Sequence, residues 1–195
     1  MHPRNAMLAA MRLRRWAFVP IGFVLTACHT QAPPNWAQGG TPVDIPRARW
    51  TRGEKLFDLM PDGRVLADGE HLFTIDRAGR VYQPDNDPVA VLQPDGRLLG
   101  SDEASLGKIG LRNSSPPGHD FAWLSIGERG EVLRFDPDGD AHPDGVWTGC
   151  EPAMRACTLT THIIALVETR SRRYPMYGPG VGVGIGIGFG MGVHP

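Results

Sequence analysis

A six-residue pattern that recurs along the chain restricts its fold more than any other feature. Pro-Asp-Gly-Arg-Val-Leu fills residues 61–66, Pro-Asp-Gly-Arg-Leu-Leu fills 94–99, and related hexapeptides fill 77–82 and 128–133. The glycines that the copies share are Gly63, Gly79, Gly96 and Gly130, and the last interval is twice the one before it. This doubled interval predicts a degenerate copy between residues 110 and 118.

Each copy predicts a turn followed by a strand. Proline presets φ at about −65°, aspartate bonds back to the backbone, and glycine takes a positive φ. The aliphatic and β-branched residues that follow, such as Val81-Tyr82, favour a short strand. One copy therefore reads as one hairpin about every 17 residues.

The expected fold class is all-β, with short antiparallel hairpin repeats in a meander that forms a barrel or a sandwich. A β-solenoid with one coil per repeat is the alternative. Longer strands are expected at residues 72–75, 121–126 and 158–167, and the Trp123 region is expected to be the aromatic centre of the core. Residues 158–167 have no decisive period and could be a short helix, but we favour a strand.

The N-terminal segment, residues 1–27, reads as a signal peptide. Arg12, Arg14 and Arg15 precede an uncharged apolar run at residues 16–27, which is shorter than the roughly 20 residues that span a bilayer. The run ends in Leu25-Thr26-Ala27-Cys28, which resembles the lipobox of bacterial lipoproteins. The resemblance implies that the chain is cut before Cys28 and that the Cys28 thiol is acylated, so that the lipid bilayer is a partner.

The resemblance to lipoproteins also suggests a location for the mature chain. His29, and not an aspartate, follows the cysteine. This resembles lipoproteins that are passed to the outer membrane, a resemblance that implies the outer membrane over the inner. The mature part is similar to envelope lipoproteins that carry Asp-Gly-Arg-Val hairpin repeats, a likeness that implies no activity. An envelope protein or a glycan is a possible further partner.

The mature chain divides into three parts. Residues 28–50 are expected to be the lipidated cysteine and a flexible tether, residues 51–169 the hairpin-repeat domain, and residues 170–195 a tail. The tail is basic at Arg170, Arg172 and Arg173, and then alternates glycine with apolar residues from Gly180 to Val193. It is either a disordered extension or a strand that orders on a membrane or a sheet edge.

The charge of the mature chain argues against a nucleic-acid partner. Four of the 20 Lys and Arg residues lie before residue 28 and no acidic residue does, which leaves 16 basic against 21 acidic residues. Nucleic-acid binding requires a basic surface. We attribute the excess of acid to solubility.

Cys150 and Cys157 are the cysteines that remain once Cys28 is assigned to lipid. In an exported protein they predict a disulfide, which on the chain-entropy model contributes about 2.5 kcal/mol. A zinc site is the alternative, but two cysteines without a nearby histidine pair supply too few ligands.

Two stretches could carry chemistry. Asp136, Asp138, Asp140 and Asp144 are weak metal-ligand candidates, because they lack the spacing of a calcium-binding loop and because two Asp-Gly turns explain them equally well. Ser114 and Ser115 lie close in sequence to His119 and Asp120, but without the Gly-x-Ser-x-Gly turn of a hydrolase nucleophile. His71 and His162 are expected to pack or to lie at the surface, and no residue is assigned as catalytic.

The sequence therefore favours a membrane-anchored envelope lipoprotein whose domain is a non-enzymatic binding or structural module without a cofactor. The first alternative is a hydrolase or metal-dependent enzyme that uses residues 114–144. The second is a membrane-associating or self-assembling protein that acts through its glycine-rich tail.

Overall fold

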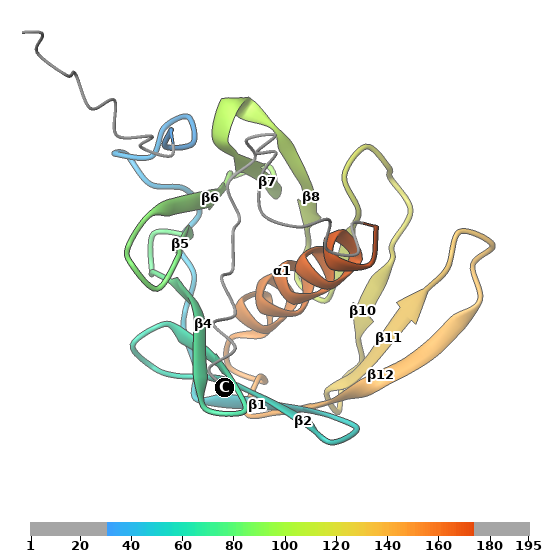
Figure 1. Ribbon diagram of the computed structural model, residues 1–195. Coiled ribbons are helices and arrows are strands. Elements are labelled where there is room, and N and C mark those ends of the chain that lie inside the picture. The colour runs from blue at the N-terminus through green and yellow to red at the C-terminus, as the bar shows by residue number, and fades with distance from the viewer. Residues whose placement is uncertain (1–30, 174–195) are drawn as a thin grey trace, which may run out of the picture.

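Twelve antiparallel strands form a closed barrel around one helix, α1, in a computed structural model that describes residues 31–173 (Figure 1). Each strand pairs with its neighbours in sequence, and β1 closes the barrel against β12. The expected all-β meander is confirmed as a barrel; a solenoid is not formed. The strands are β1 (Ala48–Arg52), β2 (Lys55–Leu59), β3 (Arg64–Ala67), β4 (Glu70–Ile75), β5 (Arg80–Tyr82), β6 (Pro88–Leu92), β7 (Arg97–Gly100), β8 (Ser105–Ile109), β9 (Asn113–Ser115), β10 (Leu124–Ile126), β11 (Glu131–Phe135) and β12 (Ala141–Thr148).

The repeated hexapeptide makes every second hairpin turn. The four shared glycines all have positive φ, between 72° and 90°. The carbonyl of each accepts a hydrogen bond from the strand after next: Gly63 from Ile75 N at 2.9 Å, and Gly130 from Trp147 N at 2.8 Å. Each turn is thus tied to the following hairpin, which explains why the same residues recur.

The degenerate copy lies at residues 110–113. Gly110 N donates to the Asn113 carbonyl at 2.8 Å, which closes a turn one residue shorter than in the other copies, where Met60 N, for example, donates to the Arg64 carbonyl at 2.9 Å. Ile126 N donates to the Arg112 carbonyl at 2.7 Å. Arg112 therefore holds the place of the repeat glycine in the copy that follows Gly96. The copy has kept the backbone bond to the following hairpin, while it lost one residue of the turn and its Asp-Gly signature.

Inward-facing side chains of the strands form the wall of the core. Trp50 and Trp147 are fully buried with ring centroids 5.9 Å apart, and Phe57 stacks on Trp50 at 5.0 Å. This cluster is the aromatic centre, so the expectation for the Trp123 region is wrong. Trp123 is only partly buried and packs against the edge of the core.

The expected strand at residues 158–167 is wrong, because these residues belong to α1 (Met154–Arg173). Residues 156–166 are all buried, so the helix has no solvent face along this stretch (Figure 1). A barrel of twelve strands is too wide for wall side chains alone to fill. The hydroxyls of the three buried threonines among residues 31–173, Thr158, Thr160 and Thr161, bond to carbonyls four residues back, which allows a polar helix to be enclosed.

The strands alternate in direction, so the loops gather at two ends of the barrel. We call one the repeat-turn end, with loops 60–63, 76–79, 93–96, 110–112 and 127–130. The other, the helix-exit end, has loops 53–54, 68–69, 83–87, 101–104, 116–122 and 136–140. Helix α1 follows β12 at the repeat-turn end, where Thr158 Oγ1 donates to the Leu111 carbonyl at 2.8 Å, and runs toward the helix-exit end.

The described part of the expected tether is packed on the barrel. Gly40 N donates to the Ala78 carbonyl and Thr41 N to the Leu92 carbonyl, both at 2.7 Å. Val43 is buried in the core, and β1 begins at Ala48. Residues 33–46 therefore lie against the barrel and do not form a free linker.

Candidate functional site

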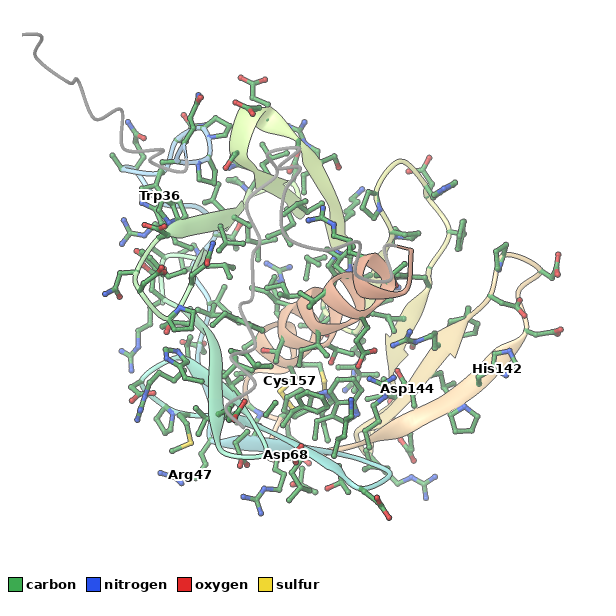
Figure 2. The ribbon with its side chains drawn as sticks, in the orientation of Figure 1. Trp36, Arg47, Asp68, His142, Asp144 and Cys157 are labelled. Carbon is green, nitrogen blue, oxygen red and sulfur yellow. A yellow bond between two sulfur atoms is a disulfide. The ribbon has the colours of Figure 1, made fainter. Side chains whose placement is uncertain are left out.

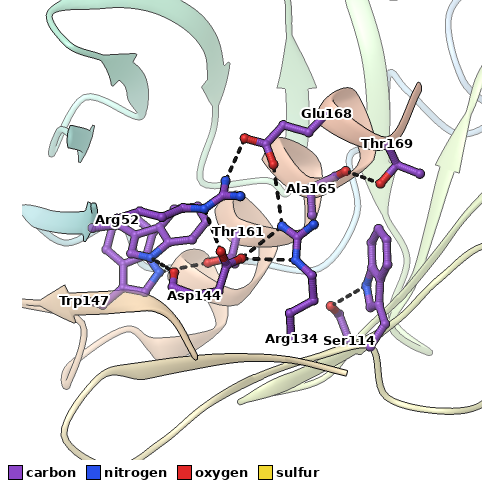
Figure 3. A network of polar contacts seen from close by, with 11 residues as sticks. Arg52, Ser114, Arg134, Asp144, Trp147, Thr161, Ala165, Glu168 and Thr169 are labelled. Carbon is purple, nitrogen blue, oxygen red and sulfur yellow. Dashed lines mark hydrogen bonds and ion pairs between the residues drawn. The ribbon is translucent and has the colours of Figure 1, made fainter. Parts of the chain in front are cut away.

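An ion network joins the barrel wall to the second half of α1 (Figure 3). Arg52 Nε lies 2.6 Å from Asp144 Oδ1, and Arg52 Nη1 lies 2.6 Å from Glu168 Oε1. Arg134 Nη2 donates to Asp144 Oδ2 at 3.0 Å and lies 3.6 Å from Glu168 Oε2. The two carboxylates and two guanidinium groups cancel in charge, and their side chains are 11–25% exposed.

The network fixes the second half of α1 to strands β1, β11 and β12 of the wall. Burial works against the charge of Arg52, but hydrogen bonds and attraction to Glu168 and Asp144 outweigh burial and raise its pKa. The Asp144 carbonyl also accepts a hydrogen bond from Trp50 Nε1 at 2.9 Å. The carboxylate of Asp144 is thus paired with Arg52 of β1 and Arg134 of β11, and its carbonyl is bonded to Trp50.

His162 is enclosed between α1 and the wall at β8. Trp123 Nε1 donates to His162 Nδ1 at 3.1 Å, and His162 Nε2 lies 2.7 Å from the Leu106 carbonyl. Because an indole nitrogen only donates, Nδ1 is unprotonated and Nε2 carries the proton. Burial lowers the pKa of His162 to about 4, and the bond to Leu106 opposes that shift only in part. His162 is therefore a neutral packing residue, as expected, although it lies on a helix and not on a strand.

The weak metal candidates do not converge. Asp136 Oδ1 accepts from the backbone N of Asp138 and Asp140, so it closes the β11–β12 turn. Asp144 belongs to the ion network, at the base of the same hairpin, while His142 lies farther out along β12 (Figure 2). Among residues 31–173 no three His, Cys, Asp or Glu side chains are grouped so as to hold a metal ion.

The serine, histidine and aspartate candidates share a region without forming a triad. Ser114 is buried and accepts a hydrogen bond from Trp123 Nε1 at 3.2 Å. Ser115 Oγ donates to the Asp120 carbonyl at 3.4 Å, and the His119 ring packs against Phe121. Neither serine hydroxyl contacts a histidine, so neither is set up as a nucleophile.

Two adjoining depressions lie on the outer surface where loop 116–122 overhangs β8. Their volumes are about 320 and 290 Å³, and Lys108 and Asp120 line both. Lys108 is opposite Arg97 on β7 and Ser115 on β9. Arg97 is paired with Asp95 at 2.6 Å, whereas Lys108 has no carboxylate partner among residues 31–173. The sequence did not single out Lys108, because nothing local reveals that its neighbours leave it unpaired.

The predicted disulfide is present. Cys150, which directly follows β12 and Gly149, is bonded to Cys157 in the first turns of α1. The bond fixes the start of the helix to the end of the wall strand that leads into it. Cys28 and the tail from Tyr174 onward lie outside the described residues.

No helix of the described chain combines the length and the apolar character needed to cross a membrane. The search of protein-family models, of curated proteins and of solved structures returned no match to this chain.

Proposed function

We propose that this protein is a lipoprotein of the bacterial envelope, acylated at Cys28, whose barrel is a non-enzymatic binding or structural module. The pairing of Cys150 with Cys157 carries the proposal. It leaves Cys28 as the single thiol of the chain, and Cys28 is the residue that follows the apolar leader and the small residues Thr26-Ala27. A disulfide also suits an exported protein, since export delivers the chain to an oxidising compartment.

The filled interior supports a surface role for the barrel. Wide barrels that carry small ligands enclose them in a central cavity. Here the axis is taken by α1, whose residues 156–166 are buried on all sides. Binding would therefore use the outer surface or the loops, on a body made rigid by its enclosed helix.

Replacement of the candidate lipid attachment residue tests the anchoring. In cells fed a fatty-acid probe, the wild-type chain should become labelled and sediment with membranes, whereas Cys28→Ser should be unlabelled. Cys150→Ser/Cys157→Ser is the matched control, because it removes two other cysteines and should keep the label. Equal labelling of wild type and Cys28→Ser would contradict the proposal.

We propose the depressions beside Lys108 as a site for a small anionic ligand. Their combined size falls in the usual range for small-molecule sites. Lys108 forms no ion pair with a carboxylate among residues 31–173, although Asp120 also lines both depressions. Titration of the barrel with glucuronate, followed by amide chemical shifts, should move residues in loop 116–122. Lys108→Met should abolish those shifts while it leaves the spectrum otherwise intact; identical shifts in both proteins would exclude Lys108.

A further inference from the structure

The chain enters the described structure at the helix-exit end of the barrel. The Gln31 carbonyl accepts a hydrogen bond from Ser101 Oγ at 2.6 Å, and Ser101 begins loop 101–104 at that end. Two residues later, Pro33 is buried. The entry point is therefore fixed on the barrel within a few residues of Cys28.

The following segment holds that entry point in place. The Trp36 ring packs edge-on against Tyr82, with centroids 4.9 Å apart, and the Arg80 guanidinium lies 5.9 Å from the Trp36 ring. Figure 2 shows Trp36 on the outside of the molecule, away from the helix. From there the segment reaches the repeat-turn end at Gly40 and Thr41.

Helix α1 ends at the same end of the barrel. Glu168 is held by Arg52, the last residue of β1 before loop 53–54. Arg170 follows half a turn later. Both stretches of chain that lie outside residues 31–173 thus continue from the helix-exit end.

We infer that the helix-exit end faces the lipid bilayer and that the repeat-turn end points away from it. The inference rests on the proposed acylation of Cys28. Gln31 is three positions after Cys28, so a fully extended chain spans at most about 11 Å between them. A flexible tether of residues 28–50 would let the barrel turn freely. Because residues 33–46 are docked on the barrel, only the short segment between Cys28 and Gln31 is left to act as a tether.

The two ends of the barrel differ in charge, so the orientation decides which charges face the membrane. The six loops of the helix-exit end contain ten Asp and Glu residues and no Lys or Arg, whereas the repeat-turn loops named above contain four acidic and three basic residues. The acidic rim would face the headgroups across a gap of about one Debye length, about 8 Å at physiological salt. The acyl chains, and not charge attraction, hold it there, and the Asp-Gly-Arg turns are presented to partners.

Headgroup quenching measures this orientation directly. Acylated full-length protein is reconstituted in vesicles of zwitterionic lipid that contain a nitroxide-headgroup lipid. A fluorophore is attached through Asp85→Cys, in an exposed loop of the helix-exit end, or through Glu128→Cys, in an exposed turn of the other end. Because Cys28 is acylated and the other cysteines are bonded, each variant carries one free thiol. We expect at least threefold stronger quenching at residue 85 than at residue 128.

A spacer variant supplies the control. Twelve Gly and Ser residues inserted after Thr30 should leave acylation of Cys28 intact. They should remove most of the difference in quenching between residues 85 and 128, because the longer segment no longer limits rotation of the barrel. Equal quenching at both positions in the acylated protein would overturn the orientation while the lipoprotein assignment stands. Absence of acyl label on Cys28 would overturn both.

Discussion

Gly63 and Gly69 have nearly the same backbone conformation, with φ of 90° and 91°, but different surroundings. A Cβ atom on Gly63 would lie 1.9 Å from the Ile75 carbonyl oxygen, whereas one on Gly69 would meet nothing within 4 Å. The repeat glycine is therefore required twice, once for its positive φ and once for the close approach of the next hairpin.

The pair separates these two requirements by mutation. Gly69→Ala should cost about 1 kcal/mol of unfolding free energy, from backbone strain alone. Gly63→Ala should cost about 2 to 4 kcal/mol, because the Ile75 carbonyl must also move. Chemical denaturation of both variants measures the difference. Equal losses would show that the close approach is relieved without cost.

His162 should make stability depend on pH in a defined window. Its folded pKa of about 4 lies below the unfolded value near 6.5, so the unfolded chain binds more protons between these values. Stability is then fully present above pH 6.5 and is lost as the pH falls toward 4, by about 3 kcal/mol in total.

Urea unfolding between pH 7 and 4.5 checks this. His162→Gln can accept from Trp123 and donate to Leu106 without titrating, so its stability should change little over the same range. Three carboxylates, those of Asp62, Asp95 and Asp136, have pKa values lowered chiefly by hydrogen bonds from backbone N–H groups. Their protonation therefore changes the stability at a lower pH than that of His162. Parallel pH profiles for wild type and variant would refute the role of His162.

At the scale of secondary-structure elements, the sequence predicts those elements whose conformation depends on neighbouring residues. The turns and short strands follow from Pro-Asp-Gly and β-branched residues, whose preferences act within a few positions. Helix α1 could not be found in this way, since residues 158–164 are rich in threonine and isoleucine, which favour strands. Its helical state depends on enclosure by the barrel, which only the complete fold provides.

The ion network was hidden for a related reason. Arg52 and Glu168 are 116 positions apart, and neither belongs to a motif. Only the closure of β1 on β12 and the insertion of α1 bring them together. The sequence suggests a metal-ligand role for Asp144 only weakly, as one of several closely spaced carboxylates, whereas its side chain is paired with Arg52 and Arg134.

Two adjacent threonines test how α1 is held in the barrel. Thr161 Oγ1 accepts from the buried Trp147 Nε1 at 2.8 Å, so Thr161→Val would leave that donor unsatisfied. We expect a loss of about 1 to 3 kcal/mol. Thr160 Oγ1 bonds only to the Ala156 carbonyl within the helix, and Thr160→Val should be close to neutral. Thermal unfolding of the two variants compares them; an equal loss would refute the anchoring by Thr161.

At the scale of the whole molecule, the charge distribution opposes attraction to an anionic lipid surface. Arg170, Arg172 and Arg173 belong to the last turns of α1, at the end of the barrel whose loops hold ten carboxylates. Each basic residue near an anionic membrane contributes about 1 kcal/mol, but here the acidic loops outnumber the three arginines. Acylation would therefore supply the membrane attachment, and the basic stretch would not.

Vesicle sedimentation of the unacylated chain, residues 29–195, tests this balance. We expect no more binding to anionic than to neutral vesicles at low salt, and no loss of binding as salt rises, because screening relieves repulsion. A matched chain that ends at residue 173 isolates the glycine-rich segment. Strong binding to anionic vesicles that falls with salt would show that the arginines outweigh the acidic rim. Binding that salt does not affect and that disappears with residues 174–195 would instead identify the apolar side chains of the tail as a second membrane attachment.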